Sequence, residues 1–175
     1  HSRALSHWGE VLRLNRGDLV LESEGLNGMV EAMLDGGQLE NAGRQVERLQ
    51  RVSRASGDTR RIAEATATSG MWHLARGEFE LGRRELETAA AIAATLGADR
   101  LQLRCRLLIS EMEMRTGDLD AADEVARWAK RFADERGLHN ELAQACVRLV
   151  LLAVARGERN RVKADVEAAE ASLQS

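Results

Sequence analysis

Glycine recurs at a strict spacing of twenty residues through the whole 175-residue chain. The series consists of Gly17, Gly37, Gly57, Gly77, Gly97, Gly117, Gly137 and Gly157. A fixed period of this length is typical of repeat proteins, in which each unit is the same piece of secondary structure. The period therefore constrains the architecture before any single segment is assigned.

The segment Ala75–Gly97 shows what one unit contains. Gly77 follows an arginine and precedes Glu78, which suits the end of one helix and the acidic start of the next. After it, Phe79, Leu86 and further apolar residues recur at helical spacing. The chain has no proline and only 3% aromatic residues, and good helix formers dominate it. The sequence therefore predicts an all-α fold.

Two such units form a helical hairpin of forty residues. We expect one helical-repeat domain over 1–175, with the tail of a preceding helix at 1–17 and repeats at 18–57, 58–97, 98–137 and 138–175. One hairpin cannot bury its own apolar face, so neighbours must stack into a right-handed superhelical solenoid of antiparallel hairpins. Two separate four-helix bundles are the alternative, and the unbroken period favours the solenoid.

Small residues align when the second helices are compared at a spacing of forty. Ala42, Gly82 and Ala122 share a position, followed by Val162 in the last repeat. A glycine inside a helix costs about 1 kcal/mol relative to alanine unless packing requires it. We therefore expect close contact between helix backbones at Gly82, and also at Gly70, seven residues before Gly77.

Charge and cysteine content limit the partners and the compartment. The formal net charge of −3 argues against a direct nucleic-acid surface. Cys105 and Cys146 lie in apolar helical runs, which favours buried thiols in a reducing, cytoplasmic compartment. No apolar run is long enough to span a membrane. Since the chain does not begin with methionine, we expect a fragment of a longer protein.

The sequence contains no catalytic or metal-binding motif. It lacks HExxH, CxxC, GxSxG and a phosphate-binding glycine loop, and its four histidines are scattered. His73 and His139 could act as acids or bases, but no nucleophile is placed with either. We expect no enzyme activity, no cofactor and no metal.

Two stretches resemble the tetratricopeptide repeat (TPR). In both, a small residue precedes the turn glycine by seven, and apolar or small residues follow it, as in Gly70…Gly77-Glu78-Phe79…Gly82 and Ser110…Gly117-Asp118-Leu119…Ala122. The family's usual repeat has about 34 residues, with a proline that is missing here. The longer form is similar to repeats of large bacterial multidomain regulators, including LuxR-type ATP-dependent transcription activators. The resemblance implies an interaction fold for residues 18–175.

The resemblance also implies a concave groove lined by the first helix of each repeat. Carried onto this sequence, the expected partner-binding residues are Glu24, Asn27, Glu31, Asp35, Met71, Leu74, Arg104, Glu111, Met114, Arg115 and Leu151. This groove would be acidic at one end. At the other it would carry an apolar strip made of Met71, Leu74, Leu107, Met114, Leu151 and Val154. Burial of the strip in the core is the alternative.

These features predict a scaffold for protein or peptide partners within a bacterial regulatory or signalling protein. The acids of the first repeat favour a basic partner segment. A small-molecule inducer-sensing domain of a LuxR-type activator is the alternative, and self-association through the apolar strip is a third hypothesis. A basic stripe of Arg44, Arg48 and Arg51 is interpreted as a solvated outer face rather than an anion-binding surface.

Overall fold

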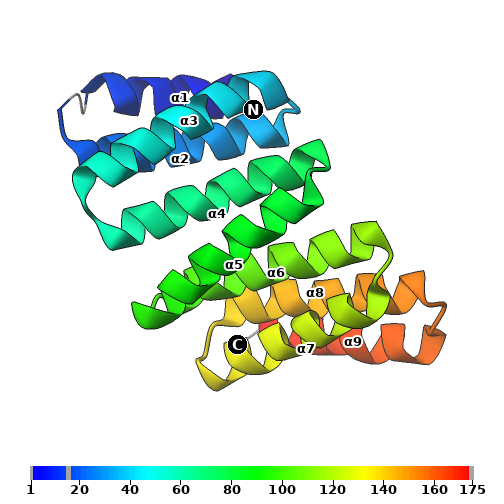
Figure 1. Ribbon diagram of the computed structural model, residues 1–175. Coiled ribbons are helices and arrows are strands. Elements are labelled where there is room, and N and C mark those ends of the chain that lie inside the picture. The colour runs from blue at the N-terminus through cyan, green and yellow to red at the C-terminus, as the bar shows by residue number, and fades with distance from the viewer. Residues whose placement is uncertain (1, 15–16, 174–175) are drawn as a thin grey trace. The chain divides into compact units, whose positions relative to one another are not determined.

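The computed structural model describes residues 2–14 and 17–173, and these form nine helices and no strand (Figure 1). The helices are α1 (Ser2–Leu14), α2 (Leu19–Asp35), α3 (Leu39–Ser56), α4 (Thr59–Arg76), α5 (Phe79–Thr95), α6 (Asp99–Thr116), α7 (Leu119–Glu135), α8 (His139–Ala155) and α9 (Arg159–Leu173). They fall into two compact units, the first ending at Ala98 and the second beginning at Asp99. The assignment of residues 1–175 to one helical-repeat domain stays a prediction.

The periodic glycines end the helices, as the sequence predicts. All eight have positive φ, from 62° at Gly97 to 99° at Gly17, a conformation that costs other residues a steric penalty. At Gly37 the N–H donates to the Leu34 carbonyl at 3.0 Å, and the next N–H, of Gln38, donates to Met33 at 2.9 Å. This pair of bonds is a Schellman motif, which satisfies the last carbonyls of the helix.

Aspartates begin several of the helices that follow. The Asp18 carboxylate accepts hydrogen bonds from the N–H groups of Val20 at 3.0 Å and Leu21 at 3.1 Å. Asp58 caps α4 with two such bonds, and Asp118 caps α7 with one, from the Ala121 N–H. Such caps satisfy N–H groups that have no partner within the helix.

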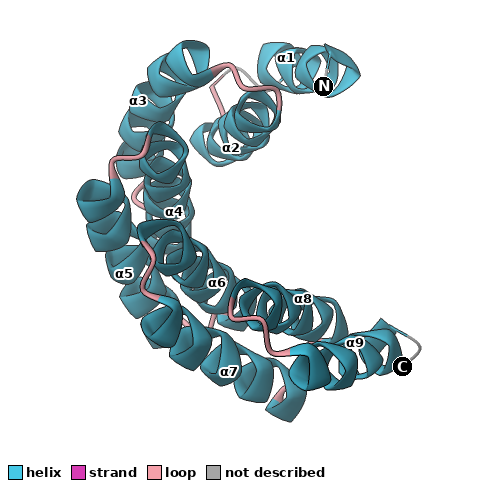
Figure 2. Ribbon diagram, turned by 90° about the vertical axis from the view of Figure 1, so that its right-hand side faces the viewer, coloured by secondary structure: helices cyan, strands magenta, loops and turns pink. Residues whose placement is uncertain are grey.

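Consecutive helices pack as antiparallel hairpins within each unit (Figure 1). The pairs are α2 with α3, α4 with α5, α6 with α7 and α8 with α9, and α1 packs on α2. In the second unit α6 and α8 lie in one layer and α7 and α9 in the other, as Figure 2 shows. In the first unit α2 likewise lies beside α4.

The core of each unit lies between successive hairpins as well as inside them. In the first unit, Leu26 and Leu49 of one hairpin cluster with Ala65 of the next. In the second, Ala122 and Ala126 of α7 cluster with Leu149 and Leu152 of α8. Because the apolar faces are buried by the neighbouring hairpin, stacking is part of the folding of each repeat.

Glycine also allows close contact between helices, as expected at Gly70 and Gly82. A β-carbon on Gly82 would lie 3.1 Å from the Gly70 carbonyl oxygen, so α4 and α5 are in backbone contact. A second glycine in close contact, Gly43, was not predicted from the sequence. The ring of Trp72 covers Gly43 so closely that an added β-carbon would be 2.7 Å from it, and the indole N–H donates to the Leu39 carbonyl at 2.9 Å.

No described helix combines the length and the apolar character that crossing a bilayer requires.

Candidate functional site

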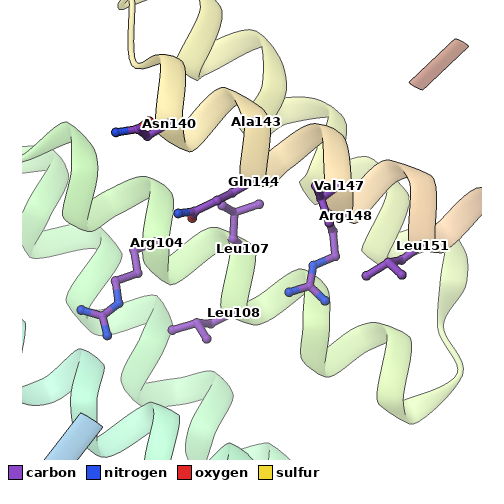
Figure 3. Close-up of a pocket in the computed structure, with 9 residues that line it drawn as sticks. All are labelled: Arg104, Leu107, Leu108, Asn140, Ala143, Gln144, Val147, Arg148 and Leu151. Atoms are coloured by element: carbon purple, nitrogen blue, oxygen red, sulfur yellow. The ribbon is translucent and has the colours of Figure 1, made fainter. Parts of the chain in front are cut away.

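A groove of about 720 Å³ lies between α6 and α8 in the second unit (Figure 3). Its lining consists of Arg104, Leu107, Leu108, Asn140, Ala143, Gln144, Val147, Arg148 and Leu151. The volume falls in the range of roughly 300–1,000 Å³ that is typical of small-molecule sites. Its volume is about twice that of the hollows beside Val52 on α3, about 360 Å³, and beside Trp128 on α7, about 320 Å³.

Helical spacing places the groove residues in rows. Asn140, Gln144 and Arg148 follow one another every fourth residue on α8, and Arg104 and Leu108 do so on α6. Leu107 is only 7% exposed and belongs to the core beneath. The apolar wall on α8 is open, with Val147 52% and Leu151 47% exposed. Polar and apolar side chains therefore face the same open space.

The charge of this groove is mixed, with arginine prominent. The guanidinium of Arg148 donates to Glu111 at 3.0 Å and lies 3.9 Å from the Met114 sulfur. Arg104 extends from α6 along the opposite side of the groove, as Figure 3 shows. The prediction that this end of the surface is apolar thus needs correction, because two guanidinium groups border its leucines and valine.

In the first unit, the acidic residues of α2 are engaged by other side chains. Glu24 pairs with Arg61 at 2.9 Å, and Arg61 also donates to Glu64 at 2.8 Å. Partial burial opposes the charge of Arg61, but the hydrogen bonds and charges of Glu64 and Glu24 outweigh it and raise the pKa of this guanidinium. The acidic end is therefore partly neutralised by α4.

Two further predicted residues of α2 also form internal contacts. The amide of Asn27 donates to Glu31 at 2.9 Å, and the Thr68 hydroxyl of α4 donates to the Asn27 carbonyl oxygen. Asp35 is exposed at the last position of α2. Of Glu24, Glu31 and Asp35, only Asp35 has no side-chain ion pair or hydrogen bond among the described residues.

The predicted exposed apolar strip is wrong at two of its positions. Leu74 is 4% exposed and Leu107 is 7% exposed, so both belong to the core. Met71 is half-buried, and Met114 packs against the cluster of Ala122, Ala126, Leu149 and Leu152. Only Leu151 and Val154 are exposed as expected. The physical reason is that a helix inside an array is covered on two sides, so its buried arc is wide.

The remaining predicted residues, Arg104, Glu111 and Arg115, lie in α6. Arg104 lines the groove, Glu111 pairs with a groove arginine, and Arg115 is exposed near the end of the helix. None of these contacts tests a partner-binding role, so the role stays a prediction.

The groove positions carried over from the TPR resemblance also include Gln144 and Val147 of the last repeat, but they miss four lining residues: Leu108, Asn140, Ala143 and Arg148. All four lie about one helical turn from assigned residues, since Leu108 follows Arg104 by four, Asn140 and Arg148 flank Gln144 by four, and Ala143 precedes Val147 by four. An i±4 extension of the expected row would have found them.

The other candidate side chains form contacts within the protein or are buried in it. His73 lies 2.6 Å from Glu78 at the turn between α4 and α5, with no nucleophile in the contacts found. Arg48 of the basic stripe pairs with Glu22, and Arg44 donates to Asn41 at 2.5 Å. Cys105 and Cys146 are buried thiols that form no disulfide with each other. No group of three His, Cys, Asp or Glu residues in the described segments is placed to hold a metal ion.

Comparisons with known proteins identify the fold. No family model and no curated protein matches this sequence. The structure of BtubC (BKLC) from P. vanneervenii superposes with a TM-score of 0.74 at 12% identity, over 99% of this chain and 70% of that one.

Two structures of a Podosopora anserina putative kinesin light chain with nearly identical TPR-like repeats are also similar. They give TM-scores of 0.69 and 0.66 at 14% identity, over 98% of this chain and 85% and 86% of theirs. Identity this low supports the fold alone. The predicted fold class is confirmed: the chain is an all-α, TPR-like helical solenoid.

Proposed function

We propose that the chain is an interaction scaffold, and that the groove between α6 and α8 binds an extended segment of a partner protein. The observation that carries this proposal is the combination of an open apolar wall with hydrogen-bonding side chains on one groove. Val147 and Leu151 supply apolar surface, which is the usual basis of affinity in interfaces. A TPR-like fold is consistent with this role.

The polar rows suit the backbone of an extended peptide. Asn140 and Gln144 are exposed amides one turn apart, and each can donate and accept hydrogen bonds. Their spacing of about 6 Å along the helix resembles the distance spanned by two residues of an extended chain. The neighbouring Arg104 and Arg148 favour a segment with a carboxylate over the basic segment that the α2 acids suggested.

The wider setting rests on the sequence resemblance. We propose that the scaffold belongs to a larger cytoplasmic bacterial regulator, where the bound segment would come from a signalling partner. This setting predicts kinase, ATPase or DNA-binding domains in the parent open reading frame, and sequencing that frame tests it.

The groove can be tested by selecting binders from a phage-displayed library of random dodecapeptides. We expect enriched peptides whose affinity falls by roughly thirtyfold in the Asn140→Ala, Gln144→Ala double variant, because two hydrogen bonds of about 1 kcal/mol each are lost. Asn160→Ala removes an exposed amide from α9 and should leave affinity unchanged. Peptides that bind the double variant as tightly as the parent, or a library without binders, would contradict the proposal.

A small-molecule sensor is the second candidate, because the groove volume and its four polar side chains meet the usual requirements of a ligand site. The open α8 wall argues against it, since small ligands are mostly enclosed by their pockets. A thermal-shift screen against metabolites distinguishes the two. A metabolite that raises Tm in the parent but not in Arg104→Ala would favour the sensor.

A further inference from the structure

One row of apolar side chains on α8 is exposed. Val147, Leu151 and Val154 are 52%, 47% and 59% exposed, and their spacing of four and three residues puts them on one face of the helix. On α9, Val166 is also exposed, at 37%. Capping repeats of solenoids usually present a polar outer face, whereas the hairpin of α8 and α9 exposes these apolar side chains.

The forty-residue period shows what covers the same row elsewhere. Forty residues earlier stand Leu107, Glu111 and Met114 of α6, and α8 contacts all three. Leu107 clusters with Ala145, Glu111 pairs with Arg148, and Met114 packs on the cluster that holds Leu149 and Leu152. On α6 this row is therefore the contact surface for the first helix of the next hairpin.

The first unit uses the row in the same way. Its members there are Asn27, Glu31 and Leu34 of α2. Asn27 accepts a hydrogen bond from Thr68 of α4, and Leu34 packs on the cluster that Trp72 of α4 also joins. The row thus repeats as a hairpin-to-hairpin contact in both units.

The second helices of the hairpins show the same difference between covered and exposed positions. Ala126 of α7 is fully buried because it clusters with Leu149 and Leu152 of the following first helix. Its equivalent on α3, Val46, is 3% exposed, whereas the equivalent on α9 is Val166, with 37% exposed. Both helices of the last hairpin therefore expose the positions that a following hairpin covers in the preceding ones.

We infer that Val147, Leu151, Val154 and Val166 form a docking face for one more helical hairpin of the same forty-residue kind. Val147 and Leu151 are also the open wall of the groove between α6 and α8, so a docked hairpin would take the place of the peptide proposed above. Continuity with the α6–α8 contact defines its chemistry. The docked helix runs in the direction of a first helix and carries a small residue where Ala145 meets Leu107, so that the backbones can approach. Apolar residues at the equivalents of Leu149 and Leu152 would cover Val154 and Val166.

The test supplies that hairpin by extending the full chain with a copy of its own residues 136–175. The copied glycine then falls at position 177, twenty after Gly157, so the period is kept. The contact between the added hairpin and α8 then pairs the same repeat positions as the contact between α8 and α6. We expect Tm to rise by about 5 °C and the amides of residues 145–155 to exchange more slowly with deuterium.

Paired variants show whether the docking face causes the change. Leu151→Glu should leave the Tm of the original chain nearly unchanged, because the side chain is exposed there. In the extended chain the same substitution should abolish most of the gain in Tm. Leu81→Glu is the matched control, because Leu81 is 45% exposed on α5, and it should change neither the gain in Tm nor the added protection.

Two results would overturn the inference. The first is an extended chain with unchanged Tm and unchanged exchange in α8. The second is a concentration-dependent dimer of the original chain in light scattering that Leu151→Glu dissociates, which would assign the face to a second copy instead.

Discussion

The backbones of Gly70 and Gly82 touch where α4 crosses α5. A β-carbon on Gly82 would lie 3.1 Å from the Gly70 carbonyl oxygen and 3.3 Å from the Leu74 nitrogen. Both neighbours are backbone atoms, which cannot move aside as a flexible side chain can. The contact explains why glycine stands inside a helix at this position despite its low helix propensity.

Gly82→Ala should therefore destabilise the protein by roughly 1–3 kcal/mol, because the methyl group forces the two helices apart. Gly9→Ala is the matched control. Gly9 lies inside α1 with no atom within 4 Å of an added β-carbon, so alanine there should stabilise by up to about 1 kcal/mol. Urea denaturation followed by circular dichroism measures both. A gain in stability for both variants would refute the close contact.

Asp123 should make stability depend on pH. Partial burial opposes its charge, but hydrogen bonds from Arg161 and Arg127 outweigh this and lower its pKa. Since the folded pKa lies below the unfolded value of about 3.9, this stabilisation is present above pH 4 and disappears as pH falls through the folded pKa.

Asp123→Asn should accordingly cost roughly 1–2 kcal/mol at pH 7, and its difference from the parent should shrink towards pH 3. The measurement is the urea midpoint as a function of pH. Asp134→Asn, at an exposed position of the same helix, is the control and should show no such convergence. Equal losses at pH 7 and pH 3 would mean that the charge of Asp123 contributes nothing.

The thiol of Cys105 should be unreactive in the folded protein. Burial raises its pKa to about 12, although the nearby charges of Arg104 and Arg106 oppose the shift. At pH 8 only about one molecule in 10,000 would carry the thiolate that attacks a disulfide reagent. Native protein should therefore react with DTNB orders of magnitude more slowly than protein in guanidinium.

The variant Cys146→Ala isolates Cys105 for this measurement. Its free energy of unfolding should also fall as pH rises above about 8.5, because the unfolded thiol ionises while the folded one does not. Rapid stoichiometric labelling in native buffer would contradict the burial of this residue.

Asp35 offers the cleanest test of a basic partner. Asp35→Lys places a positive charge at the C-terminal end of α2, which favours the helix by about 0.3–1 kcal/mol. If acids of the first repeat attract a basic segment, affinity for a fluorescent Lys/Arg decapeptide at low salt should fall. Unchanged affinity in a polarisation titration would exclude attraction through this end.

Glu31→Lys would answer the same question less directly. It removes the hydrogen bond from Asn27, which also accepts from Thr68 of α4, and so should lower stability by about 1 kcal/mol. A loss of binding in this variant must therefore be compared with its unfolding curve, whereas Asp35→Lys needs no such correction.

The groove shows where sequence reasoning stopped. The TPR resemblance implied that first helices line the groove, and Arg104 and Leu151 do lie beside this hollow, while their partner-binding role stays a prediction. Leu74 was assigned to the same surface and is instead core. A leucine on a broad apolar arc is compatible with either place, and only its neighbours decide between them.

The sequence by itself determined the helices, their ends and their pairing, because these depend on local chemistry. Glycine permits the positive φ that ends a helix, and an aspartate such as Asp18 caps the next within three residues. Only the tertiary structure decided which part of each arc is covered, where Arg61 finds Glu24, and which row of α8 stays open. Those outcomes depend on side chains in different hairpins, such as Glu24 and Arg61, which are 37 residues apart, and their contacts exist only after the hairpins have stacked.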